Sequence, residues 1–495
     1  MRTAQGAWLM RLAVCVIVGL LVLLGLAPYG FGLRAHTIIS SIAAQLAQGW
    51  HVPVVMTAYQ RGWFSSTAAM QLPVSGVLAA LWRVSESSTE AAQDEATLLQ
   101  ISQRILHGPF PLSTAVPSMA GLAPVQALLQ STVRPVLSGT APVPPGPETI
   151  PVLHVTTTVF LSGASQSRVF IPAFVTSTST ARSAPLVWNG LRGEVQVSQR
   201  GDQVLSALRA PGLYVKQART QMSLQNVLLR LETHSEQHQA LHGQVMVSLD
   251  SLEIGPEAEA QAEWSVQDGE GRTRLALAGE MVQADVDVQC ALCRFANAAA
   301  GQGSAHLEAR RLSLPVLLRL GQEVATLWPE EPDMRTLWLR LVLSGELTAA
   351  LAALARSSPT LALTQARLRT PEGDVAVTAH LQLDAERARV AERLSLLVQS
   401  IDAEATLEAP VDWVQELAVA QAVRFIRERS DFGAFLSLKS LRTMAAIAVD
   451  KYLRNLVAQG YLNQEGGRYR SRARYTQGQL LINEQPVALP MLIPW

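Results

Sequence analysis

Apolar and polar residues alternate with a period of two along much of this chain. Residues 245–250 and 375–384 show the pattern clearly, since every second residue is apolar and most of those between are polar. Similar segments recur from 186 to 290 at broadly similar spacing, although no fixed repeat is visible. The pattern predicts an α+β fold that is β-rich, with an elongated or curved antiparallel sheet whose strands have one covered and one wet face.

Spacings of three and four replace this alternation in several segments, which predicts interspersed helices. The expected helices cover residues 87–106, 315–328, 347–356, 411–429 and 436–459. The last of these carries an amphipathic stripe that includes Leu441 and Ala445, and Gly460 supplies its C-terminal stop. A terminal hairpin is expected from strands at 469–475 and 479–482, with a turn at Asn483-Glu484.

An uncharged apolar run covers residues 12–33 and follows Arg2 and Arg11. A run of this length crosses a hydrocarbon core of about 30 Å as a helix. Basic residues on its N-terminal side predict a cytoplasmic N-terminus and a periplasmic body, anchored in the bacterial inner membrane by one transmembrane helix. The alternative is a signal peptide that is cleaved after Gly25-Leu26-Ala27.

Composition shifts suggest five segments. They are a signal anchor at 1–33, an N-terminal region at 34–138, a proline-rich connection at 139–151, a β-rich body at 152–400, and a C-terminal helical region with the terminal hairpin at 401–495. The connection holds five prolines within thirteen residues, which is too many for a helix or a strand.

Charge and motif content exclude several classes of function. Lys plus Arg and Asp plus Glu both number 40, so the excess of positive charge typical of nucleic-acid binding is missing. None of the three lysines follows a glycine, which removes the Walker-type phosphate loop, and neither HExxH nor Gly-x-Ser-x-Gly occurs. We therefore expect no catalytic residue, cofactor or metal, and regard an unrecognised hydrolase as the least favoured reading.

Two patterns of metal-binding or redox residues have alternative readings. Strand alternation would place Cys290 and Cys293 on opposite faces unless the strand bends, so structural thiols are favoured over a disulfide, and redox catalysis ranks last. His234, His238 and His242 would share one side of a helix. Residues 233–241 lie between two strand-like segments, however, so a solvated polar loop is favoured over a metal site.

Three short segments together carry a family resemblance. Residues 59–66 read Tyr-Gln-Arg-Gly-Trp-Phe-Ser-Ser, residues 107–112 read His-Gly-Pro-Phe-Pro-Leu, and residues 475–480 read Tyr-Thr-Gln-Gly-Gln-Leu. In this order after an apolar N-terminal run, they resemble the YdgA-like family of bacterial envelope proteins over essentially the whole chain. The resemblance implies a periplasmic body without an assigned biochemical role. The chain departs from the pattern at Glu484, where a glycine is expected, and AsmA-like lipid-handling proteins are a more distant likeness in architecture.

The motif residues have a structural and a functional reading. They are Tyr59, Arg61, Gly62, Trp63, Phe64, Ser65, Ser66, His107, Gly108, Pro109, Tyr475, Gly478 and Asn483. The favoured reading is a structural clasp in which Arg61 stacks between aromatic rings on a strand face. The alternative is a rim that meets lipid head groups. His107 is expected at a helix end, with no identifiable partner nucleophile.

The leading functional expectation is a non-enzymatic envelope protein that binds or shields lipid on a curved sheet, with the membrane and phospholipid as partners. The alternative is a structural or interaction module without a ligand, homo-oligomeric through exposed strand edges or the C-terminal amphipathic helix. An open apolar groove would favour the first, and apolar faces covered by the chain's own helices would favour the second.

Overall fold

The computed structural model describes residues 55–73, 97–107, 125–137, 152–176, 186–217, 220–236, 240–256, 264–295, 301–319, 346–389, 399–429 and 437–487. The chain forms two compact units. Unit 1 comprises residues up to Thr176 together with Asn189–Arg209, and unit 2 comprises Ser177–Trp188 and the chain from Ala210 onward. The apolar run at 12–33 and the proline-rich connection at 139–151 lie outside the described residues.

Unit 1 is an antiparallel sheet whose strands pair largely in chain order. The strands are β1 (Val55–Arg61), β2 (Ser65–Pro73), β3 (Thr97–His107), β4 (Val125–Leu137), β5 (Leu153–Phe160), β6 (Ser165–Ile171), β7 (Phe174–Thr176), β9 (Leu191–Val197) and the first part of β10 (Gln203–Gln217). Each of β1 to β5 pairs with the next, β6 pairs with β5 and β9, and β9 pairs with β10. A small core packs Met70, Ile105 and Ala127 between neighbouring strands.

The helix expected at 87–106 is wrong over its described part, because Thr97–His107 forms strand β3. The segment fits both periods, since Ile101 and Ile105 are four apart while Leu99, Ile101 and Ile105 also occupy alternate positions. Pairing with β2 on one edge and β4 on the other decides for the strand. Ile105 is then fully buried between its neighbours.

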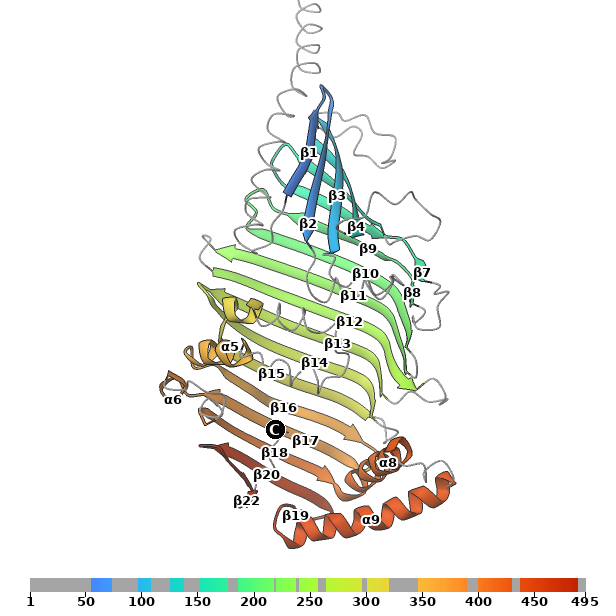
Figure 1. Ribbon diagram of the computed structural model, residues 1–495, viewed down its shortest axis with the longest axis vertical. Coiled ribbons are helices and arrows are strands. Elements are labelled where there is room, and N and C mark those ends of the chain that lie inside the picture. The colour runs from blue at the N-terminus through green and yellow to red at the C-terminus, as the bar shows by residue number, and fades with distance from the viewer. Residues whose placement is uncertain are drawn as a thin grey trace, which may run out of the picture. The chain divides into compact units, whose positions relative to one another are not determined.

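Unit 2 is a longer antiparallel sheet (Figure 1). Its main strands are β11 (Thr220–Glu236), β12 (Ala240–Pro256), β13 (Trp264–Ala278), β14 (Met281–Phe295), β15 (Gly301–Ser313), β16 (Thr360–Thr370), β17 (Gly373–Leu383), β18 (Ile401–Pro410), β20 (Arg468–Thr476), β21 (Gln479–Ile482) and β22 (Gln485–Val487). Each pairs with the one before it. The short β19 (Asn463–Glu465) also pairs with β20, and β8 (Leu186–Trp188) pairs with the second part of β10. The predicted β-rich antiparallel architecture is confirmed.

Four helices are bounded within the described part of unit 2: α5 (Glu346–Ala355), α6 (Ala385–Arg389), α8 (Val411–Arg429) and α9 (Leu438–Ala458). Three of these agree with predicted helices to within two residues at each end. Helix α9 begins where the Ser437 side chain accepts a hydrogen bond from the backbone N–H of Ser440, and it ends before Gly460, whose φ is +79°. None of the helices in the described residues combines the length and the apolar character needed to cross a membrane.

A row of irregular positions crosses β11 to β14. Asn226 and Asp268 have positive φ angles of 49° and 47°, which short polar side chains tolerate best. Beside this row Leu249 pairs with Gly269 while Leu252 pairs with Val266. Leu249 and Leu252, three residues apart, therefore lie on the same face of the sheet, as do Gly269 and Val266. The strands bend here, and their apolar residues stay on one face. Figure 1 shows β12 to β14 curving together.

Candidate functional site: an apolar trough on unit 2

One face of the unit 2 sheet is apolar across many strands. Directly paired residues of an antiparallel sheet project to the same side, so the pairing identifies rows of neighbours. One row joins Val247, Gly271, Val288, Ala305, Ala366, Val377 and Leu407. The adjacent row joins Val245, Thr273, Val286, Leu307, Leu363, Ala379, Ala405, Ala473 and Ile482. Strand alternation in distant segments thus combines into one continuous apolar face.

The opposite face is polar and carries ion pairs. Arg310 lies 2.6 Å from Asp285, and Arg472 lies 2.8 Å from Glu404. The Nδ1 atom of His306 lies 2.6 Å from Asp287. Hydrogen bonding to Asp287 and the nearby negative charges raise the pKa of His306 above its usual value. Because these groups are partly exposed, each pair contributes little to stability, and this face suits contact with water.

A cavity of about 650 Å³, here called the central hollow, lies on the apolar face. Its floor is made of small residues from three strands, β13, β15 and β16: Gly269, Gly271, Gly303, Ala305 and Ala366. Its walls include Leu249, Val266, Val288, Leu368 and Val375. Glycine and alanine side chains project less from the sheet than the leucine and valine side chains around them. The surface is therefore hollow over the small residues. The volume lies within the range of about 300–1,000 Å³ that is typical of ligand sites.

Gly271 could carry a side chain without a steric clash at its Cβ atom. A Cβ atom built on Gly271 would meet only the Val247 carbonyl oxygen, 4.0 Å away, and its φ lies outside the positive region that favours glycine. Gly303 differs, because a Cβ there would lie 2.7 Å from the Cys290 sulfur. A larger side chain therefore fits at Gly271 and would occupy the central hollow.

A second hollow of about 310 Å³ lies on the same face, further toward the C-terminal strands. Leu307, Leu361, Leu381 and Leu480 contribute to its lining, together with the motif residue Tyr475. Burial raises the pKa of the Tyr475 phenol above its ordinary value. The sequence motif around Tyr475 thus supplies one wall of an apolar surface.

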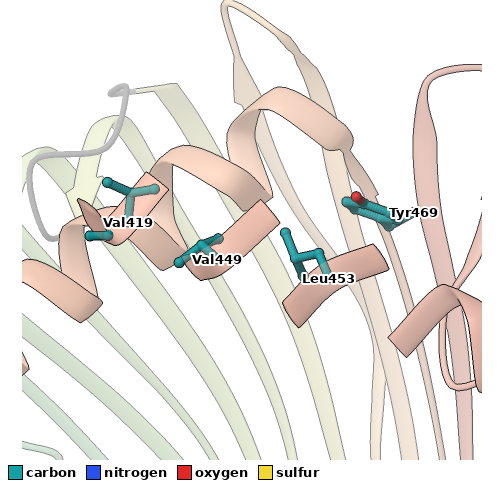
Figure 2. Packing of buried hydrophobic residues seen from close by; sticks show 5 residues of the cluster. Val419, Val449, Leu453 and Tyr469 are labelled. Carbon is teal, nitrogen blue, oxygen red and sulfur yellow. The ribbon is translucent and has the colours of Figure 1, made fainter. Parts of the chain in front are cut away.

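Described helices cover this face only at its ends. Tyr469 on β20 is buried against Val419 of α8 and Val449 and Leu453 of α9 (Figure 2). At the other strand ends, α5 packs Ala355 against Leu383 of β17. Between these ends Leu307, Leu361 and Leu407 are each 37% exposed and Val288 is 48% exposed. We call this open apolar face between α5 and the α8–α9 pair the trough.

Cys290 and Cys293 form a disulfide at the edge of the central hollow. The preference for separate structural thiols is wrong, because the pairing of β14 with β15 shifts register between the two cysteines. Cys290 pairs with Gly303 and Cys293 with Gly301, so three steps along β14 match two steps along β15. This bulge brings both sulfur atoms to the apolar face.

The sequence interpretation did not single out the residues of the trough. The signal was present as Gly269-Glu270-Gly271 and Gly301-Gln302-Gly303, two Gly-x-Gly segments inside strand-like patterns. Glycines in strand interiors often mark bulges or places where a ligand approaches closely. Their alignment into one floor depends on strand pairing, which alternation alone does not give.

Residues of two sequence motifs meet in unit 1. The Ser66 hydroxyl lies 2.7 Å from His107 Nε2 and accepts a hydrogen bond of 3.2 Å from the Tyr59 hydroxyl. Ser66 and His107 are only 1% and 3% exposed, and burial lowers the pKa of His107. His107 is the last residue of β3, not a helix end as expected. A serine and a histidine thus form a pair, but both are buried away from solvent, which suits a structural role.

The turn between β1 and β2 carries the other residues of the first motif. Trp63 and Phe64 are 49% and 59% exposed, so neither ring lies in the core and Trp63 does not sit on a strand face. Gly62 donates a backbone hydrogen bond of 2.8 Å to the Ser65 carbonyl oxygen. A Cβ at Gly62 would lie 2.5 Å from that oxygen, so the tight turn requires glycine.

The remaining motif residues are in the terminal hairpin or outside the described residues. Gly478 has a φ of +80° in the β20–β21 turn. Asn483 has a φ of +48°, accepts a hydrogen bond from the Arg472 backbone N–H, and donates to the Gly460 and Tyr461 carbonyl oxygens. These contacts fix the hairpin against the end of α9. Gly108 and Pro109 lie outside the described residues.

The polar loop expected at 233–241 is wrong in its described part. Residues 233–236 belong to β11 and 240–241 to β12, where His234 pairs directly with His242. His238 lies outside the described residues. No cluster of three or more metal-ligating side chains is found in the part of the chain that the structure describes.

A family model described as "Bacterial protein of unknown function (DUF945)" matches residues 9–490. The chain belongs to this family. No curated protein matches the chain, and no solved structure does. Membership in DUF945 therefore assigns a bacterial origin and no activity, and the comparisons give no support to the AsmA-like likeness.

Proposed function

We propose that this DUF945 member is a non-enzymatic envelope protein that binds or shields the acyl chains of a phospholipid in the trough of unit 2. The observation that carries the proposal is the continuous apolar face with its central hollow of about 650 Å³. Exposing such a surface to water is unfavourable. An acyl chain laid along the trough would gain about 0.8 kcal/mol for each methylene removed from water.

The proposed location supports a lipid ligand. The apolar run at 12–33 would hold the chain in the bacterial inner membrane, with the body on the periplasmic side. The YdgA-like resemblance of the motifs agrees with this placement. A periplasmic body held beside the bilayer would have access to phospholipid, whose acyl chains match the apolar trough.

The burial of the Ser66–His107 pair supports the non-enzymatic part of the proposal. Both residues are buried, and neither hollow of the trough includes them. Catalysis by a serine and a histidine needs a nucleophile that the substrate can reach. We therefore assign this pair to the stability of unit 1.

Gly271→Phe tests the lipid proposal. A Cβ atom at this position meets nothing closer than the Val247 carbonyl oxygen, 4.0 Å away, and a phenyl ring attached to it would enter the central hollow that Gly271 lines. Displacing two or more methylenes of a bound chain would weaken binding by at least about tenfold. The full chain would be purified in mild detergent, and lipids that remain bound would be counted by native mass spectrometry.

Arg274→Phe is the matched control, because Arg274 lies on the same strand but pairs with Asp285 on the polar face. We expect near-stoichiometric phospholipid on the wild type and on Arg274→Phe, and strongly reduced lipid on Gly271→Phe. Lipid-free wild-type protein that also fails to bind a fluorescent acyl probe would contradict the proposal.

The second candidate is an interaction module that forms a homo-oligomer. The observation that favours it is the outward face of α9, where Met444 and Ile447 are 58% and 67% exposed. Lipid-free protein whose mass by light scattering doubles with concentration, and returns to the monomer value in Ile447→Ser, would support this candidate over lipid binding.

A further inference from the structure

We propose that the β1–β2 turn of unit 1, formed by Arg61, Gly62, Trp63 and Phe64, docks on the surface of an anionic phospholipid bilayer. The inference goes beyond acyl-chain binding in the trough, since it concerns unit 1 and a contact with an intact membrane. It therefore stands or falls separately from the proposed function.

The turn presents large aromatic rings to solvent from a rigid base. Trp63 and Phe64 are 49% and 59% exposed. Gly62 closes the turn through its hydrogen bond to Ser65, and the His107 backbone N–H donates a 2.8 Å hydrogen bond to the Phe64 carbonyl oxygen. A preorganised turn loses little conformational freedom when its rings enter an interface.

The buried motif residues form that base. Ser66 lies two residues after Phe64, and its hydrogen bonds with Tyr59 and His107 connect β1, β2 and β3. The two halves of the motif therefore have distinct roles. The polar half fixes three strands beneath the turn, and the aromatic half projects from it.

The charge of the surrounding strands selects an anionic partner. The described residues of β1 to β5 contain Arg61, Arg104 and Arg134 but no Asp or Glu. Arg61 is the last residue of β1, and Arg104 pairs with Thr67, three residues beyond Phe64. Basic residues near an anionic bilayer surface are attracted to it, and tryptophan favours the head-group region. Both features of the turn thus point to a lipid surface.

The test uses the full chain incorporated into nanodiscs. A Cys15→Ser background leaves no free thiol, because Cys290 and Cys293 are bonded. A fluorophore is attached at Phe64→Cys, and a lipid with a nitroxide on its head group serves as quencher. Val55→Cys is the matched control, since Val55 is 56% exposed and lies at the end of β1 that is away from the turn.

We expect strong quenching at position 64, little at position 55, and a fall of the quenching at 64 when phosphatidylglycerol is replaced by phosphatidylcholine. Arg61→Gln and Trp63→Ser, each made in the Phe64→Cys background, should lower the quenching at 64 while the melting temperature stays within a few degrees. Equal quenching at 64 and 55, or none at either site, would overturn the proposal. Quenching that ignores lipid charge would overturn the assignment to an anionic surface.

Discussion

At the residue scale, burial decides what the ionisable motif residues can do. His107 is enclosed at the end of β3, where burial lowers its pKa. His306 lies on the polar face of unit 2, where a hydrogen bond to Asp287 and nearby charges raise its pKa. Two histidines of one chain therefore respond to pH with opposite signs, because burial sets the shift at His107 and the carboxylate of Asp287 sets it at His306.

The stability of unit 1 should fall as the pH drops below about 6.5, the ordinary pKa of histidine. In this range the unfolded chain binds a proton at His107, whereas the folded chain, whose pKa is lower, does not. The free energy of unfolding therefore decreases until the pH reaches the folded pKa. Urea midpoints measured from pH 7.5 downward should show this loss, and His107→Gln should reduce it.

His306→Gln provides the opposite control. The raised folded pKa of His306 means that its contribution is present below about pH 6.5 and is lost as the pH rises through the folded value. Its removal should therefore lower stability by a constant amount below about pH 6.5 and abolish the loss that His306 contributes as the pH rises above that value. An unchanged pH profile in His107→Gln would contradict the assignment of that decline to His107.

At the scale of elements, α9 has one packed side and a broad exposed surface. Leu441, Ala445, Val449 and Leu453 occupy the packed side and are 9% exposed or less, whereas Met444 and Ile447 face outward. The spacing of three and four that predicted the helix also places Ala445, Val449 and Leu453 against α8 and Tyr469. Packing of α8 and α9 then closes one end of the trough.

Leu441→Ala should lower the free energy of unfolding by about 2–5 kcal/mol, because Leu441 is 1% exposed and its removal leaves a cavity. Met444→Ala, on the same helix and 58% exposed, should change it by less than about 0.5 kcal/mol. Chemical denaturation of both variants measures the difference. Equal losses would show that the outward side of α9 is also covered in solution.

At the scale of the whole molecule, two antiparallel units follow an apolar N-terminal run, and lipid contact is proposed at both units. The trough of unit 2 would hold acyl chains, and the aromatic turn of unit 1 would meet head groups. Both proposals are consistent with a chain whose N-terminal segment anchors it in a membrane. The two proposals can be tested separately, since one concerns lipid bound to unit 2 and the other concerns contact of unit 1 with the membrane surface.

The anchor predicts that the full chain stays in the inner-membrane fraction after an alkaline wash, because about 20 apolar residues hold more strongly than a peripheral contact. Leu21→Arg places a charge near the centre of the run and should increase extraction, since such a charge costs about 2.5–3.5 kcal/mol in a membrane helix. Release of wild-type protein whose mature chain begins near Pro28 would instead support cleavage of a signal peptide.

The sequence by itself determined the features that depend on neighbouring residues. Alternation predicted the strands and their two-faced character, and three- and four-residue spacing predicted α5, α8 and α9. The preference of glycine and asparagine for positive φ angles predicted the helix end at Gly460 and the turn at Asn483-Glu484. These features follow from local periodicity and dihedral preference, so a short window of sequence contains the information.

Only the tertiary structure decided which distant residues share a position in space. Strand pairing turned 97–106, the described part of the helix expected at 87–106, into β3 and placed His107 at the end of that strand beside Ser66. A bulge moved Cys290 and Cys293 to one face, and the register of β13 with β14 and of β14 with β15 aligned Gly269 and Gly303 into one floor. Register between strands is a non-local property, since a shift by one residue exchanges the two faces while the alternation of each strand stays the same.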